Sequence, residues 1–139
     1  MFENVPSWAN NYIGIDYSPM GRLPESGLDC YGLVYHIYRC EFDIMLPAYV
    51  GSYASPEEHE EIGRLIRAET SSDWISVQVP GLGDVALFDV HGEPAHTAVV
   101  VWPGIMLHIR RGAGSCLERY DTPTWKPRLV GFYRHPRRT

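Results

Sequence analysis

The spacing of the apolar residues changes once along this chain, and that change limits the folds open to it. An early stretch repeats at helical intervals and comprises Leu33, Val34, Ile37 and Tyr38. From residue 75 onward, apolar residues alternate with others, which is the spacing of strands in a sheet. Helical segments followed by a run of strands predict an α+β fold in which N-terminal helices pack on a central antiparallel β-sheet.

Two helices are predicted, each from a cap at its start. Asp29 stands just before the apolar stripe and its carboxylate suits an N-cap, so the first helix is expected to begin at Cys30. A capping-box sequence with proline at the first helical position begins at Ser55, and it predicts a second helix over Pro56–Ala68. Cys30 would then lie in the first turn of its helix.

The best-defined strands are predicted on either side of Trp102-Pro103-Gly104, over Thr97–Val101 and Ile105–Arg110. With a three-residue connection, Val101 faces Ile105, Ala98 faces His108, and His96 lies diagonally from His108 on the same face. The opposite face is then almost wholly apolar and fits a core: Thr97, Val99, Val101, Ile105, Leu107 and Ile109. Further strands are predicted around 75–79 and 85–87 and over Val130–Tyr133.

The length and charge of the chain restrict its organisation and its partners. With 139 residues and no linker-like segment, a single domain over 1–139 is expected. The net charge of −5 argues against nucleic-acid binding, and Arg134, Arg137 and Arg138 are interpreted as a frayed basic tail. No apolar run reaches the length of a membrane span, and the first residues lack the pattern of a secretion signal, so synthesis in the cytoplasm without a signal peptide is expected.

Three cysteines, Cys30, Cys40 and Cys116, form an odd set without a close pair, which predicts neither a disulfide framework nor a zinc ribbon. Cys40 at the end of the first helix and Cys116 near the turn at 112–115 are expected to be structural. A zinc site built from Cys30 and the histidines at 91, 96 and 108 is disfavoured, because the His91 to His96 spacing contains Pro94 and matches no zinc signature. We expect no metal and no other cofactor.

Cys30 is the candidate nucleophile. A cysteine in the first turn of a helix lies near unpaired amides and the positive end of the dipole, which favours the thiolate. Two histidines on one face supply what a cysteine hydrolase needs, one to take the thiol proton and one to orient the first. A small buried cysteine and structural histidines are the alternative, and periodicity alone leaves both interpretations open.

Four segments in order resemble the motifs of NlpC-type cell-wall peptidases. Gly27-Leu28-Asp29-Cys30-Tyr31-Gly32-Leu33-Val34 resembles the family's Asp-Cys-x-Gly-Leu-Val nucleophile motif. Gly83-Asp84-Val85-Ala86-Leu87-Phe88 resembles its Gly-Asp-Leu-x-x-Phe strand. The strand starting at His96 resembles His-Val-Gly-Ile, and Met106-Leu107-His108 resembles the strand with the third catalytic residue. The resemblance runs from about Tyr12 to Tyr133.

The resemblance implies a papain-like NlpC fold and a role for each matching residue. Cys30 would attack the scissile carbonyl, His96 would exchange the proton, and His108 would hold the His96 ring. Substrate would contact Tyr17, Asp29 and Tyr31, although a structural tyrosine packing the loop explains Tyr17 nearly as well. Two positions depart from the motifs, because Tyr31 replaces a usual serine and Ala98 a usual glycine.

Tyr31, Ile44-Met45-Leu46-Pro47 and Gly131-Phe132-Tyr133-Arg134-His135 look like the phage-tail and gene-transfer-agent branch of the family. That branch implies a peptidase that cleaves amide bonds in peptidoglycan stem peptides, within a virion or phage-like tail and beside other tail-tip or hub proteins. The family implies a γ-D-glutamyl to diamino acid bond as the target. The alternative is a structural tail-tip component with the same fold and little or no hydrolytic activity.

Overall fold

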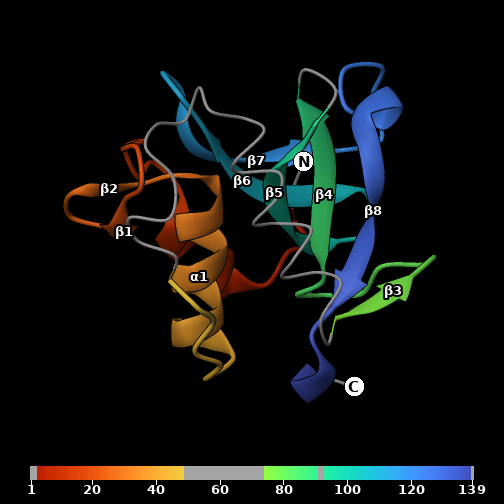
Figure 1. Ribbon diagram of the computed structural model, residues 1–139, viewed down its shortest axis with the longest axis horizontal. Helices are drawn as coiled ribbons and strands as arrows, with labels where there is room; N and C mark the ends of the chain where they lie inside the picture. Colours follow the sequence, from red (N-terminus) through yellow and green to blue (C-terminus); the bar gives the residue numbers. More distant parts are fainter. Residues whose placement is uncertain (1–2, 49–73, 91–92, 139) are drawn as a thin grey trace.

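A six-stranded antiparallel sheet organises the molecule in a computed structural model, which describes residues 3–48, 74–90 and 93–138. The strands lie in the order β3-β8-β4-β5-β6-β7, and Figure 1 shows helix α1 on one side of this sheet. Their bounds are β3 Ile75–Val77, β4 Val85–Val90, β5 Glu93–Trp102, β6 Ile105–Arg110, β7 Gly114–Arg119 and β8 Leu129–Arg134. The predicted α+β fold with an antiparallel sheet is confirmed.

Helix α1, Cys30–Glu41, begins where the sequence predicts. Asp29 has extended backbone angles, and its carboxylate accepts a hydrogen bond from the Gly32 amide at 2.7 Å, which is an N-cap. The helix ends before Asp43, whose φ of 54° lies in the left-handed region. The second predicted helix, Pro56–Ala68, lies outside the described residues.

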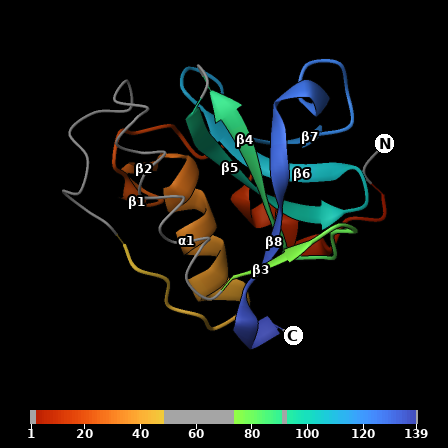
Figure 2. The same cartoon turned by 45° about the vertical axis from the view of Figure 1, so that its right-hand side comes forward.

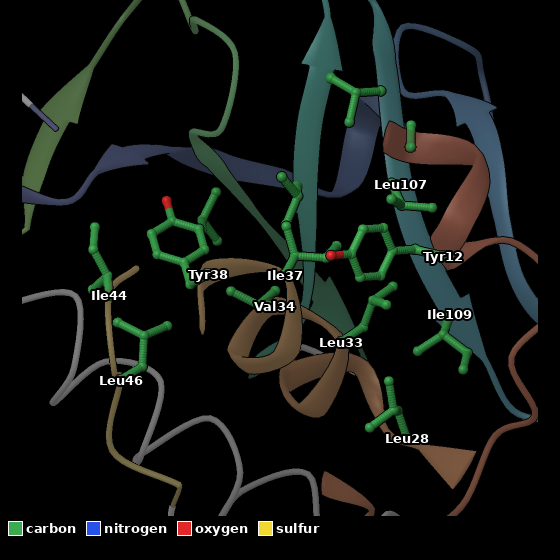
Figure 3. Packing of buried hydrophobic residues seen from close by; sticks show 14 of the residues in the cluster. Tyr12, Leu28, Leu33, Val34, Ile37, Tyr38, Ile44, Leu46, Leu107 and Ile109 are labelled. Carbon is green, nitrogen blue, oxygen red and sulfur yellow. The ribbon is translucent and has the colours of Figure 1, made fainter. Parts of the chain in front are cut away.

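The apolar stripe of α1 packs on one face of the sheet, as Figure 2 shows. Figure 3 shows this core, in which helix residues such as Leu33 and Ile37 lie beside Leu107 and Ile109 of β6. Each large apolar side chain buried there contributes about 1.5–3 kcal/mol relative to an exposed one. The Tyr38 hydroxyl also donates to the Gly83 carbonyl, which joins the helix to the segment that precedes β4.

The β5–β6 register agrees with the prediction along most of its length. Val99 pairs with Leu107 and Val100 with Met106, and the same alignment sets Ala98 level with His108. The predicted pairing of Val101 with Ile105 is wrong, because a register shift after Val100 brings Trp102 opposite Ile105. The bulge is local, so the apolar face from Thr97 to Ile109 remains buried as predicted.

The other face of the central strands is also a core, which the sequence patterns did not indicate. It is formed by Ala86, Phe88, Ala98, Val100, Met106, Tyr120, Trp125 and Phe132. The chain after β7 runs back across this face, with Trp125 just before the 3₁₀ turn η2, Lys126–Arg128. The histidines of β5 and β6 therefore project into packed surroundings and not toward open solvent.

The N-terminal segment runs beside the edge strand β7. After the 3₁₀ turn η1, Ser7–Tyr12, the Gly14 amide donates to the Ser115 carbonyl, and the Ser115 amide donates to the Ile15 carbonyl. A two-stranded hairpin, β1 Arg22–Leu23 and β2 Gly27–Leu28, then leads directly into α1. These contacts carry Tyr17 toward the start of the helix.

Strand β3 and the C-terminal segment differ from expectation in detail. Strand β3 stops at Val77, and Val79 is 82% exposed. The basic C-terminal segment is not frayed, because Arg134 makes two hydrogen bonds to the buried Asp84 carboxylate and Arg138 donates to the Leu82 carbonyl.

Among the described residues, no helix is long and apolar enough to cross a membrane.

Candidate active site

Cys30 is the first residue of α1 and is partly buried. Its sulfur lies near Thr97, the residue that directly follows His96 on β5. Burial, followed by the negative charge of Asp29, raises the pKa of the thiol to about 11, against the opposing effects of Thr97 and the Tyr31 backbone. The thiolate expected from the helix terminus is therefore wrong for this state, since desolvation outweighs the dipole and the thiol stays protonated near neutral pH.

The predicted histidine pair is brought together. His96 Nε2 lies 3.0 Å from His108 Nδ1, and the two side chains come from neighbouring strands. His96 is 7% exposed and His108 is fully buried. The contact uses Nε2 of His96, so Nδ1 is the ring nitrogen left for another partner.

Burial keeps both imidazoles neutral. For His96, burial lowers the pKa to about 3, with further lowering by His108, Arg110 and Arg128. For His108, burial again lowers the pKa below its ordinary value, and the carboxylate of Glu118 only partly opposes this. A neutral imidazole has one donor and one acceptor nitrogen, as a base must have.

Two further residues complete the site, Glu118 of β7 and Trp125. Glu118 Oε1 lies 2.8 Å from His108 Nε2, and Trp125 Nε1 donates to Glu118 Oε2 at 2.9 Å. The Trp125 ring stacks on His96 with centroids 5.3 Å apart and an interplanar angle of 22°.

Neither residue was among those predicted from the sequence. The signal for Glu118 was present, because a tight hairpin after β6 pairs His108 with Cys116 and places Glu118 diagonally on the same face. Trp125 lies beyond the last paired residue of β7, and its position follows from tertiary packing alone.

The three predicted substrate contacts lie near the start of α1 in different settings. Asp29 is buried, and its Oδ1 accepts a hydrogen bond from the Gly32 amide at 2.7 Å and another from Arg22 Nη1 at 2.8 Å. Tyr31 is largely buried, and its hydroxyl donates to the Pro47 carbonyl at 2.6 Å. The Tyr17 pKa is raised by burial and then by the charges of Cys30 and Asp29, which indicates that its hydroxyl lies near these two side chains. Substrate binding by these residues stays a prediction.

Gly32 shows why the nucleophile motif requires glycine two residues after the cysteine. A Cβ atom at this position would lie 2.1 Å from the Gly21 carbonyl oxygen and 3.0 Å from Asp29 Oδ1. Gly21 belongs to the loop that precedes β1, so loop and helix approach at van der Waals distance. The close approach holds the first turn of α1, and with it Cys30, against the loop that contains Tyr17.

Cys116 lies in β7 opposite His108, next to the turn at 112–115 as predicted. Its sulfur, His108 and Glu118 have potential ligand atoms within 4.8 Å of one another. His108 Nε2 and Glu118 Oε1 already lie at hydrogen-bond distance. The zinc set weighed from the sequence is different and includes His91, which lies outside the described residues.

Solved structures of similar fold come from several bacterial proteins. The NlpC/P60 domain of the peptidoglycan hydrolase SagA superposes with a TM-score of 0.60 at 21% identity, with 90% of each chain covered. An NlpC/P60 family protein from Bacillus cereus ATCC 10987 gives 0.66 at 20% identity, over 94% of this chain and 41% of the other. A lipoprotein-like NLP/P60 protein from Staphylococcus aureus subsp. aureus Mu50 gives 0.65 at 20%, over 91% and 38%.

Sequence comparison identifies the family. Gamma-DL-glutamyl hydrolase of Bacillus subtilis (strain 168) is 26% identical over 137 residues, which is 95% of this chain but only 29% of that relative. The model of the NlpC/P60 family matches residues 14–134, which include Cys30, His96 and His108. The chain therefore belongs to the NlpC/P60 family of cysteine peptidases and peptidoglycan hydrolases.

Proposed function

We propose that this protein hydrolyses an amide bond in peptidoglycan stem peptides through Cys30, His96 and His108. The observation that carries the proposal is the 3.0 Å contact between His96 Nε2 and His108 Nδ1. This contact directs the other nitrogen of His96 to act as the base, while the sulfur of Cys30 lies against Thr97, the next residue of the strand. Family membership supports the same chemistry.

We propose the following steps. His96 Nδ1 takes the thiol proton as the sulfur attacks the carbonyl carbon, and the Cys30 amide donates to the developing oxyanion. His96 then gives that proton to the leaving amine, which departs and leaves a thioester. Water gives a proton to the same nitrogen as it attacks the thioester carbonyl. The C–S bond then breaks, the carboxylic acid product leaves, and His96 returns the proton to the sulfur. His108 fixes the His96 ring throughout.

The target bond that we propose is the γ-linked glutamyl bond. The name of the Bacillus subtilis relative, gamma-DL-glutamyl hydrolase, supports a γ-glutamyl substrate for that protein. Tyr31 stands beside the nucleophile where the family usually has serine, and its buried ring occupies space that a smaller residue would leave to substrate. We therefore expect a narrower pocket beside Cys30 than in relatives with serine.

We further propose that the protein acts in a phage or phage-like tail, made in the cytoplasm and carried to the cell wall by the particle. Support comes from Tyr31 and from the segments at 44–47 and 131–135 that resemble this branch. The partners would be tail-tip or hub proteins, with no nucleic acid involved. Mass spectrometry of purified particles tests this, and absence of the protein from intact particles would contradict it.

Digestion of purified peptidoglycan, with products identified by mass spectrometry, tests the reaction. The wild type should release a fragment with a new glutamyl carboxyl group, and Cys30→Ala should release none. Cys40→Ala is the matched control, because Cys40 is exposed at the far end of the same helix and should leave activity unchanged. Intact peptidoglycan after treatment with folded wild type would favour the alternative, a structural tail-tip component.

A further inference from the structure

We propose that Glu118, held by Trp125, is a positioning residue that fixes the tautomers of His108 and His96 and so makes His96 Nδ1 the basic nitrogen. The inference rests on the proposed function for its catalytic consequence. It starts from a continuous set of contacts, from Trp125 Nε1 to Glu118, from Glu118 to His108 Nε2, and from His108 Nδ1 to His96 Nε2.

The Glu118 carboxyl accepts hydrogen bonds and donates none. Its partial burial raises the pKa, but the hydrogen bonds from Trp125 and His108 and the charge of Arg110 outweigh this, so the pKa lies below its usual value. The group is therefore ionised at neutral pH. An ionised carboxylate has only acceptor sites, so the nitrogen facing it must carry a proton.

The tautomers follow one after another from that charge. Because His108 is neutral and Nε2 carries its proton, Nδ1 of His108 has a lone pair. That lone pair accepts from His96 Nε2, so Nε2 of His96 carries the proton of that neutral ring. The remaining nitrogen, His96 Nδ1, then has the lone pair that a general base requires.

Loss of the Glu118 charge would remove the preference for these tautomers of His108 and His96. His108 would then also adopt the tautomer with the proton on Nδ1, which would donate to His96 Nε2 and place the His96 proton on Nδ1. In that state His96 has no lone pair for the thiol. The free energy of a hydrogen bond to a charged group corresponds to about a 10- to 100-fold change in an equilibrium constant. We therefore expect kcat to fall by about 10- to 100-fold, with KM nearly unchanged.

Trp125 holds the carboxylate in place from the other side. Its indole N–H donates to Oε2 of Glu118, while its ring stacks on His96. One side chain therefore orients both Glu118 and His96, the first and last residues of the hydrogen-bonded series Glu118, His108, His96. Two donors, His108 Nε2 and Trp125 Nε1, thus point at Glu118. A glutamine there has one oxygen and one NH2 group, so it cannot accept from both donors along these two directions.

This conflict gives the test. In Glu118→Gln, the indole competes for the single amide oxygen, and kcat should fall about 10- to 100-fold. In the double variant Glu118→Gln/Trp125→Phe the indole donor is gone while an aromatic ring remains, so the amide oxygen is free to accept from His108 and kcat should recover at least severalfold over Glu118→Gln. Glu25→Gln removes the charge of an exposed glutamate and is the control.

Imidazole ¹⁵N NMR reads the tautomers without any turnover. The wild type should show a protonated Nε2 and an unprotonated Nδ1 on both His96 and His108, and Glu118→Gln should show a mixture. A protonated Nδ1 on His108 in the wild type, or unchanged tautomers and kcat in Glu118→Gln, overturns the proposal. A wild type with the expected tautomers but no peptidoglycan hydrolysis contradicts the proposed function and leaves the positioning role of Glu118 intact.

Discussion

The imidazole rings of His96 and His108 meet nearly at right angles, at 79°, with Nε2 of the first 3.0 Å from Nδ1 of the second. In this geometry one edge of each ring faces the other, and each ring contributes a single nitrogen to the contact. His108 keeps Nε2 for Glu118, and His96 keeps Nδ1. The pair therefore has a direction, running from the Glu118 carboxylate through His108 to Nδ1 of His96.

Activity should extend to unusually low pH. In the proposed mechanism His96 must be neutral to accept the thiol proton, and because its pKa is lowered to about 3, it stays neutral well below the ordinary histidine value of 6.5. Cys30, with its pKa raised to about 11, stays a thiol through neutral pH. The profile of kcat/KM against pH should be a broad plateau with its acid limb far below 6.5. A limb near 6.5, or thiolate absorbance at 240 nm at pH 7 that Cys30→Ala lacks, would contradict this neutral pair.

The charge of Arg128 should help to keep the acid limb of the activity profile at low pH. Its guanidinium lies over the Trp125 ring at 5.5 Å, and its charge lowers the pKa of His96. Arg128→Gln should move the acid limb upward by about 0.3–0.5 pH, and added salt should do the same in the wild type by screening. Arg137→Gln, an exposed arginine outside the contacts of His96, is the control. If neither Arg128→Gln nor added salt shifts the pH of the acid limb, the charge of Arg128 has no effect on it.

Asp29 should matter for stability as well as for position. Its Oδ1 caps α1 and pairs with the buried Arg22, so Asp29→Ala removes a cap and leaves a buried guanidinium without its carboxylate. We expect a loss of about 3–5 kcal/mol in the free energy of unfolding by urea denaturation. Asp29→Asn retains an oxygen for the Gly32 amide and should lose less. Equal losses in the two variants would mean that the cap bond contributes nothing.

Arg134 should stabilise the fold although it comes near the C-terminus. It makes two hydrogen bonds to Asp84, a carboxylate that is only 1% exposed, so Arg134→Ala leaves a buried charge without its partner. The urea midpoint should fall clearly, whereas Arg137→Ala, an exposed change three residues later, should leave it within error. If both variants unfold at the wild-type midpoint, the C-terminal segment is frayed in solution after all.

Local patterns predicted the parts of this structure that local physics controls. The cap at Asp29, the helix start at Cys30 and the strand Ile105–Arg110 follow from side-chain chemistry and spacing within a few residues. The common face of His96 and His108 also followed, because alternation fixes which side of a sheet a residue occupies once a short loop sets the register.

What the sequence determined by itself was the order of elements and the placement of two histidines on one face, since both depend on neighbours along the chain. Only the tertiary structure decided the charge state of Cys30, because burial, the largest effect on its pKa, outweighs the helix terminus. Only the tertiary structure brought Trp125 onto His96 and Glu118. Desolvation and ring stacking depend on residues distant in sequence, and no local spacing contains them.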